Sequence, residues 1–378
     1  MKRGFIQALV LLAGFVFVVG VLQFWQGGLT GFAVFQDSSS GEFNLGTYSN
    51  TEWNGSAVVL SSGQSSGTYY SDVFETSSPA VWNNLSWVAG EFGELPDNAQ
   101  GSLMSGNILL MHLNEGSGTI SDSSGEGNDG TYNGVLYGQS GKLNDAIGFD
   151  GNNDLISTPV DLSGLAEFTI SAWYYRDSSG DRFDIAQSDD NNQDRIKLIR
   201  HNAGDVFGVI QAGSSASYAT FSEGTTGWKH IVMVFDGSGG SNAERLKMYS
   251  NGVEQSLSFT GTIPSVAPDF ENDLKIGYDD GSDTYGKGRI DEVAVWDRSL
   301  SAEEVLELYT RSILSLDVNA RSCDDDACSG ESWDDIGDVS PQDLSLGNNA
   351  YFQYGFSYST EDSSYTPWVS SVSVDYDV

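Results

Sequence analysis

The chain has 378 residues, enough for two domains or for one domain that carries an insertion. Asp and Glu number 53 against 17 Lys and Arg, a formal charge of -36, so a polyanion is repelled and we expect no nucleic-acid partner. Aromatic residues make up 12% of the chain and charged residues only 19%, which excludes general disorder and is typical of turn-rich β-structure.

The N-terminal region predicts a membrane segment. Residues 5–25 carry no charged side chain and follow basic residues, whereas acidic residues come after the stretch. At about 1.5 Å per residue, a helix here spans roughly 30 Å, the thickness of a bilayer core. The positive-inside rule then places residues 26–378 outside the cell. We expect residues 1–35 to be a retained anchor, although the small residues at 31–33 leave cleavage of a signal peptide, and hence secretion, as the alternative.

The next part of the chain predicts a small β-rich module. After a spacer rich in Ser and Gly at 36–41, residues 42–100 show strand-like alternation, and the same pattern returns over 312–378. Neither piece has enough strands to close a core alone. We therefore predict one β-sandwich module, split by a middle domain over 105–311. Two small independent sheets are the alternative.

The middle domain alternates short strand-like runs with turn residues, which predicts an all-β antiparallel fold. The Asn251-Gly252 pair between two such runs is typical of a hairpin turn. The one convincing helix covers residues 301–311, where Ser301 and Glu304 are spaced as a capping box. Its apolar stripe consists of Val305, Leu308 and Tyr309.

The strand before this helix contains an unexpected carboxylate. Side chains alternate in an extended chain, so Asp291 is predicted to share a face with Val293 and Val295, opposite Ile290. A carboxylate among valines needs a partner, either a cation or N–H groups. The same alternation sends Asp291 and Glu292 to opposite faces, where they could not act together as acid and base.

Six stretches of the middle domain, taken in order, resemble the LamG-like jelly-roll domain of the concanavalin A-like lectin/glucanase group. His112 departs from the family pattern, because an aromatic residue often stands at its position. The flanking module resembles a small β-module of prokaryotic surface proteins, in which a jelly roll can be inserted. The six stretches are 109–134, 141–159, 168–176, 227–237, 246–254 and 288–305.

The resemblance implies two antiparallel sheets with frequent calcium binding. Asp122, Asn128 and Asp129 lie in a glycine-rich loop, and in this fold the N-terminal segment lies beside the last strand. Their oxygen atoms suit Ca²⁺, so a structural calcium ion held by Asp122, Asn128 and Asp291 is one prediction. The alternative is that Asp291 accepts backbone N–H bonds from that loop without a metal.

The resemblance also implies recognition of carbohydrate or protein at the rim of the sandwich. Candidate ligand-binding residues are Asp279, Asp280, Asp283 and Tyr285, in a loop between strands, with a merely solvated loop as the alternative. Hydrolases of this group carry a Glu-x-Asp-x-x-Glu strand that is absent from this sequence, so we do not expect an enzyme.

Two further features agree with an extracellular location. Cys323 and Cys328 enclose four residues and predict a short-loop disulfide, and Asn54 and Asn84 begin N-glycosylation sequons. We therefore expect a membrane-anchored cell-surface protein that binds glycan or a surface protein in adhesion. The alternative is a structural subunit of a cell envelope or filament, without a specific small ligand.

Overall fold

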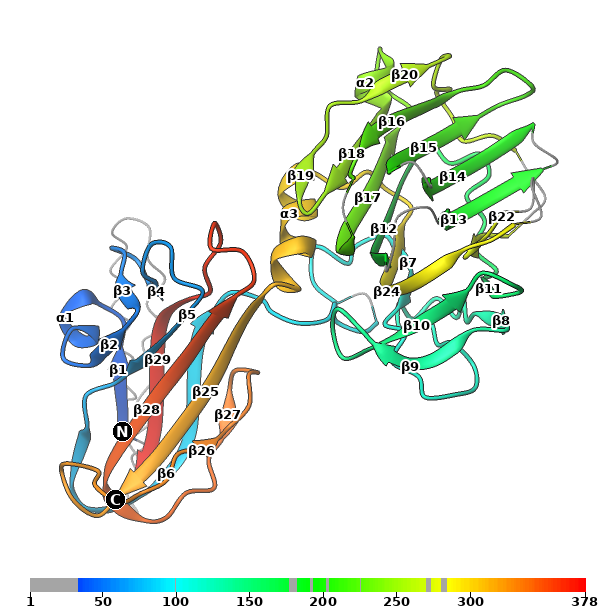
Figure 1. The fold of residues 1–378 in the computed structure, drawn as a ribbon. Helices are drawn as coiled ribbons and strands as arrows, with labels where there is room; N and C mark the ends of the chain where they lie inside the picture. Colours follow the sequence, from blue (N-terminus) through cyan, green and yellow to red (C-terminus); the bar gives the residue numbers. More distant parts are fainter. Residues whose placement is uncertain are drawn as a thin grey trace, which may run out of the picture.

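A computed structural model describes residues 33–98, 100–176, 182–190, 193–201, 204–224, 226–269, 273–279 and 284–378. Figure 1 shows these residues as two β-rich bodies that meet near helix α3 (Ala302–Arg311). The predicted membrane segment at 5–25 lies outside the described residues. Within the described part of the chain, every helix is too short or too polar to cross a bilayer. The predicted all-β class is confirmed, because strands dominate both bodies.

The small module is built from both ends of the chain. β29 pairs with β1, β4 and β6, and β28 pairs with β5, β6 and β25, so strands from the two ends alternate within its sheets. The N-terminal strands are β1 (Ala33–Asp37), β2 (Thr47–Ser49), β3 (Thr51–Trp53), β4 (Val58–Leu60), β5 (Ser66–Tyr70) and β6 (Phe74–Ala89). The C-terminal strands are β25 (Leu314–Cys323), β26 (Asp334–Asp335), β27 (Gln342–Asp343), β28 (Asn349–Thr360) and β29 (Trp368–Asp377).

One hydrophobic core joins the two ends of the chain. The ring of Trp82 lies 4.8 Å from that of Phe352, and both side chains are buried. The module starts earlier than residue 42, and the predicted spacer at 36–41 is wrong, because this stretch holds the end of β1 and the start of α1 (Ser40–Phe43). Phe35 explains the difference, since its ring packs 4.8 Å from that of Phe74 and ties β1 to the core.

The middle domain consists of two stacked eight-stranded sheets, with one core between them. The first sheet contains β7 (Asn107–Met111), β9 (Leu136–Ser140), β10 (Asp145–Asp150), β12 (Glu167–Arg176), β17 (Gly227–Asp236), β18 (Leu246–Ser250), β19 (Val253–Glu254) and β24 (Lys287–Trp296). The second contains β8 (Thr131–Asn133), β11 (Leu155–Ser157), β13 (Phe183–Asp190), β14 (Asp194–Arg200), β15 (Asp205–Gln211), β16 (Tyr218–Ser222), β20 (Ser258–Thr260) and β21 (Lys275–Ile276). A short hairpin, β22 (Tyr278–Asp279) and β23 (Thr284–Tyr285), and helix α2 (Asn242–Arg245) complete the domain.

The predicted hairpin turn and the predicted helix of the middle domain are confirmed. Asn251 and Gly252 both have positive φ and connect β18 to β19. At α3, the Ser301 hydroxyl accepts a hydrogen bond from the Glu304 N–H, and the Glu304 carboxylate accepts one from the Ser301 N–H. The predicted apolar stripe of α3 is buried against the outer face of the first sheet.

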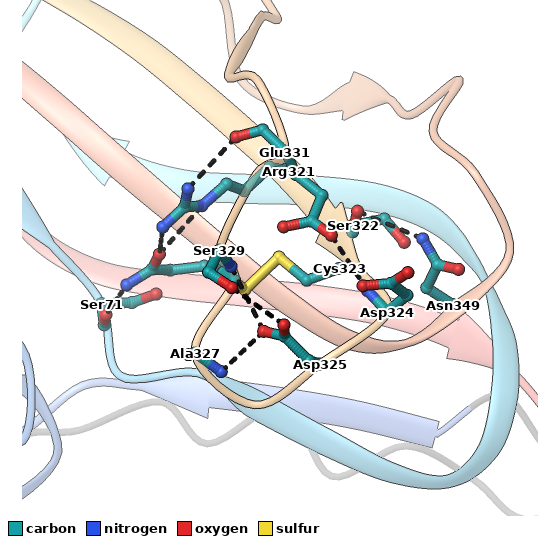
Figure 2. Close-up of a disulfide and its surroundings, with 12 residues drawn as sticks. Ser71, Arg321, Ser322, Cys323, Asp324, Asp325, Ala327, Ser329, Glu331 and Asn349 are labelled. Carbon is teal, nitrogen blue, oxygen red and sulfur yellow. Dashed lines mark hydrogen bonds between the residues drawn. A yellow bond between two sulfur atoms is a disulfide. The ribbon is translucent and has the colours of Figure 1, made fainter.

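The predicted disulfide between Cys323 and Cys328 is also confirmed. Figure 2 shows that it closes a turn at the end of β25. Asp325 lies within this turn and accepts hydrogen bonds from the backbone of Ala327 and Ser329. The disulfide and these bonds define one compact tip of the small module.

We predict that Trp82 and Phe352 contribute to the same folding unit. Trp82→Phe and Phe352→Leu should each lower the free energy of unfolding of the module by about 1–2 kcal/mol, because each leaves a gap in a packed core. Chemical denaturation of the two single variants and the double variant measures their coupling. Because the rings touch, the double variant should lose less than the sum of the two, and strict additivity would contradict a shared core.

Candidate functional site

Strand β24 carries one extra residue beside its neighbour β12. Trp173 of β12 lies opposite Asp291, whereas Ser171 lies opposite Ala294, so one residue of β12 faces two residues of β24. Glu292 lies at this bulge with a φ of 49°, in the left-handed region that residues other than glycine seldom adopt. The bulge shifts the alternation of side chains by one position.

The predicted orientation of Asp291 is therefore wrong. Ile290, Val293 and Val295 all belong to the core between the two sheets. Asp291 lies opposite Trp173, on the outer side of the first sheet. Glu292 lines a small buried cavity beside Trp173 on this same side, so the two acidic residues do not point to opposite faces.

Asp291 is fully buried and bound by N–H groups of the backbone. Its Oδ2 accepts hydrogen bonds from Lys142 N at 2.7 Å and Leu143 N at 2.9 Å, and its Oδ1 accepts one from Glu292 N at 2.9 Å. Burial first, and the charge of Glu292 second, raise the pKa of Asp291 to about 8. The donors come from loop 141–144 and from β24, not from the loop at 122–129.

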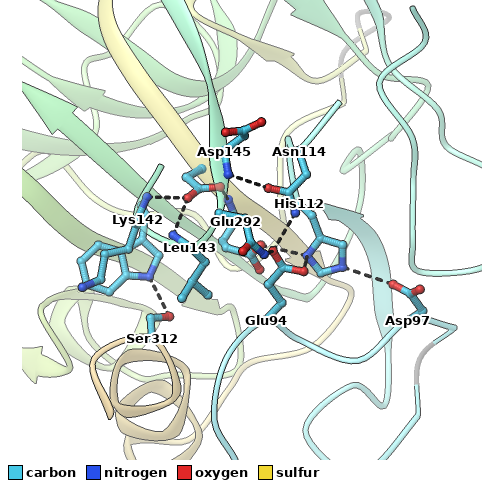
Figure 3. Close-up of polar contacts among 12 residues, drawn as sticks. Glu94, Asp97, His112, Asn114, Lys142, Leu143, Asp145, Glu292 and Ser312 are labelled. Carbon is cyan, nitrogen blue, oxygen red and sulfur yellow. Dashed lines mark hydrogen bonds and ion pairs between the residues drawn. The ribbon is translucent and has the colours of Figure 1, made fainter. Parts of the chain in front are cut away.

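His112 connects Glu292 of the jelly roll to the linker that precedes the domain. Figure 3 shows Glu94 and Asp97, both from the linker after β6, on two sides of the His112 ring. His112 Nδ1 lies 2.8 Å from Glu292 Oε1 and 3.9 Å from Glu94 Oε2, and His112 Nε2 lies 3.2 Å from Asp97 Oδ1. One imidazole thus contacts three carboxylates.

The pKa values of His112 and Glu292 are both raised above their ordinary values. Burial alone would lower the pKa of His112, but the hydrogen bond to Glu292 and the charges of Glu292 and Glu94 raise it to about 9. Burial also raises the pKa of Glu292, while the bond to His112 opposes this shift. A protonated imidazole is therefore the form of His112 that we expect at neutral pH.

The same cluster has the donor atoms of a cation site. Among the described residues, Glu94, His112 and Glu292 each offer one ligand atom, and these atoms lie within 4.8 Å of one another. Imidazole nitrogen with carboxylate oxygen suits a divalent transition metal, but the contacts described above also account for all three residues without one. The sequence pattern did not predict Glu94 and Glu292 as site residues, and it pointed to this site only through His112, which stands in place of an aromatic residue.

A buried serine–histidine pair lies nearby. Ser171 Oγ is 2.9 Å from His230 Nε2, and burial together with the charge of Lys142 lowers the pKa of His230 to about 3. The cavity beside the pair has a volume of only about 10 Å³. Among the described residues, His230 Nδ1 has no partner, so the pair lacks both room for a substrate and the carboxylate that would orient the imidazole.

The two remaining candidate calcium ligands lie together in their own loop. Asp122 accepts hydrogen bonds from Leu110 N, Asn128 N and the backbone and hydroxyl of Ser124. Burial opposes ionisation of Asp122, but these N–H groups outweigh it and lower the pKa. Asn128 donates to the carbonyl of Ile108. Asp122 and Asn128 thus bind β7, whereas the described partners of Asp291 are in loop 141–144 and β24.

The predicted ligand loop is described only in part. Asp280 and Asp283 lie outside the described residues, as does the side chain of Asp279. Tyr285 is half-buried in the β22–β23 hairpin, with its ring 4.8 Å from that of Tyr278. Tyr278 was not among the predicted ligand-binding residues, although the two tyrosines stand at the two ends of the stretch "YDDGSDTY".

We predict that Asp291→Ala destabilises the jelly roll by about 2–4 kcal/mol, because it leaves buried N–H groups without an acceptor. Thermal unfolding measures the effect, and Asp145→Ala serves as the control, since Asp145 is exposed and its substitution should change stability by less than about 0.5 kcal/mol. Equal melting temperatures for the two variants would contradict the assignment of Asp291 as a buried acceptor.

We predict that His112 titrates near pH 9, well above its ordinary value of 6.5, while His230 stays neutral down to about pH 3. NMR of the imidazole protons measures both. Because the pKa of folded His112 is raised, its contribution to stability is complete below pH 6.5 and is lost as the pH rises through 9. The variant His112→Gln should no longer lose stability as the pH rises through 9, whereas the control variant His201→Gln should lose it as the unmodified protein does. Titration of His112 near 6.5 would contradict the described contacts.

The chain is similar to several known proteins. Residues 150–306 match the family model of the concanavalin A-like lectin/glucanases superfamily. No curated protein sequence matches the chain. Similar solved structures include the receptor binding domain of botulinum neurotoxin D, with 16% identity, a TM-score of 0.43 and coverage of 55% of this chain and 53% of that chain.

Two further similar structures are of the same kind. The binding domain of botulinum neurotoxin DC in complex with rat synaptotagmin II has 13% identity and a TM-score of 0.44, over 55% of this chain and 52% of that chain. The binding domain of Paraclostridial Mosquitocidal Protein 1 has 16% identity and a TM-score of 0.41, over 55% and 53%. This chain thus spans about half the length of each. The family match and the two-sheet fold identify the middle domain as a LamG-like jelly roll of the concanavalin A-like lectin/glucanase group.

Proposed function

We propose that this protein is a membrane-tethered extracellular binding protein, whose jelly roll recognises a glycan or a surface protein in adhesion. The match to a lectin-containing superfamily supports a binding role for the middle domain. The observation that carries the proposal is the β22–β23 hairpin, which brings Tyr278 and Tyr285 together next to the second sheet.

The hairpin has the chemistry of a carbohydrate-binding rim. Two tyrosine rings with centroids 4.8 Å apart offer flat apolar surface together with hydroxyl groups. Lys275 lies 5.6 Å above the Tyr278 ring and adds a positive charge beside it. Ligand sites commonly combine aromatic surface with a few convergent polar groups on loops of a rigid scaffold.

Two observations support the proposed location outside the cell. The apolar residues 5–25 support a retained anchor, and the acidic chain with its disulfide suits the exterior of a cell. Only residues 26–32 separate that segment from β1, whose Phe35 packs in the module core. In this proposal the small module lies next to the membrane and carries the jelly roll.

The proposal includes a structural calcium ion, with Asp122, Asn128 and Asp291 as its ligands. Oxygen ligands from acidic loops support this idea, whereas the N–H bonds described for both carboxylates would have to be exchanged for metal contacts. Thermal unfolding with added calcium and with a chelator tests it. An identical melting temperature in the two conditions would remove calcium from the proposal.

We predict that Tyr285→Ala and Tyr278→Ala each weaken ligand binding by roughly tenfold or more, as expected for an aromatic contact at the centre of a site. Glycan arrays, followed by measurement of Kd for the best ligand, provide the test. The control is Tyr132→Ala, because Tyr132 is exposed and is likewise paired with another tyrosine, Tyr137, but belongs to β8. Equal loss in the control would place the site elsewhere, and ordered polymers of the protein without ligand binding would favour the structural alternative.

A further inference from the structure

The outer surface of the small module has a groove beside an exposed tryptophan. The groove has a volume of about 380 Å³, which is in the range of pockets that hold small ligands. Trp368 of β29 is 38% exposed and lies opposite Val59 of β4, whose side chain is buried. The groove is lined by Asn54, Ser56, Ala57, Val59, Thr366, Trp368 and Ser370.

One wall of this groove is a glycosylation sequon. Asn54, Gly55 and Ser56 form the turn between β3 and β4, and Asn54 is exposed. Asn54 Oδ1 accepts hydrogen bonds from Ser56 N, Ser56 Oγ and Ala57 N, each at 3.0 Å. Among the described residues, Asn54 Nδ2 has no hydrogen-bond partner. The nitrogen that would receive a sugar is therefore free, while the carbonyl is fixed by the turn.

The second sequon has a different environment. Asn84 lies within β6, between its neighbours β27 and β29, and is only half-exposed. Its Nδ2 donates a hydrogen bond to Asp343 Oδ1 at 3.4 Å. A sugar at Asn84 would have to break this bond on the β6–β27 ladder, whereas a sugar at Asn54 displaces nothing.

We propose that Asn54 carries an N-linked glycan whose first sugars pack against Trp368 in this groove. Asn54, the attachment point, and the exposed indole of Trp368 line the same groove. A glycan attached at Asn54 is therefore the ligand that we expect to cover this aromatic surface. A second groove of about 400 Å³ continues from Thr366 and Trp368 towards α3, where it is lined by Glu303 and Leu306 among others. Later sugars of the same chain would follow this path towards the jelly roll.

The attachment requires a sugar donor from the cell. Asn54 Nδ2 forms a bond to the anomeric carbon of an oligosaccharide carried on a lipid phosphate, and the bond between that carbon and the phosphate oxygen breaks. The amide nitrogen loses one proton, and the lipid phosphate leaves with the electron pair. The inference thus rests on the extracellular location in the proposed function, but not on the ligand of the jelly roll.

The test uses the full chain, produced in cells that attach N-linked glycans. Peptide mass spectrometry should find the glycan on Asn54 and an unmodified Asn84, and Asn54→Gln but not Asn84→Gln should remove it. Oxidative footprinting then compares the protein before and after enzymatic removal of the glycan. Trp368 should be oxidised several-fold faster after removal, whereas Trp228 of the jelly roll serves as an internal reference and should not change.

Each outcome decides the proposal. An exported chain that is unmodified at Asn54, or that is modified only at Asn84, overturns it and leaves the binding function intact. A glycan on Asn54 with unchanged oxidation of Trp368 overturns the packing of sugars in the groove. Protease treatment of intact cells reports export separately, and a chain that is not exported overturns both this inference and the proposed location.

Discussion

The β-bulge at Glu292 is the constraint on which the linker side of the jelly roll depends. A left-handed residue other than glycine costs about 1–2 kcal/mol, so the surrounding contacts must hold it in place. The bulge turns Asp291 and Glu292 to the outer side of the sheet, where neither carboxylate can remain without partners. Asp291 then fixes loop 141–144 through two backbone N–H groups, and Glu292 fixes His112.

These contacts extend from the jelly roll to the small module. Lys142 donates its N–H to Asp291, while its ammonium group lies 4.7 Å above the Trp173 ring and 2.5 Å from Glu361 of the module. Glu361 is largely exposed, so solvent screens this ion pair and its net contribution is small. Apolar contact also crosses the junction, and it runs from Trp173 through α3 to Tyr365 of the module.

The sequence predicted those parts of the fold that depend on neighbouring residues. The turn at Asn251-Gly252, the cap at Ser301 and the disulfide between Cys323 and Cys328 each arise from residues a few positions apart. The jelly roll was recognisable because several local patterns occurred in the right order. In each case, the residues that determine the structural feature lie close together in the sequence.

The cluster of Glu94, His112 and Glu292, beside the outer side of the first sheet, could not be predicted in the same way. Alternation assumes a regular strand, and nothing in "RIDEVAVW" indicates that Glu292 takes a left-handed conformation. The cluster also combines Glu94 of the linker with Glu292, which is almost 200 residues later. Only tertiary structure brings them together. His112 departs from the family pattern, and its contacts with Glu292 and Asp97 account for the departure.

The insertion of the jelly roll has a consequence for how the domain is held. The chain leaves the module after β6 and returns at β25, so two covalent connections enter the same junction (Figure 1). Both connections are anchored there, because Arg311 at the end of α3 binds Glu91 of the linker, and the linker's Gly93 donates to the Arg311 carbonyl. A single flexible linker would let the jelly roll rotate freely, whereas two connections bound to each other restrict it. The β22–β23 hairpin therefore keeps a defined direction relative to the module.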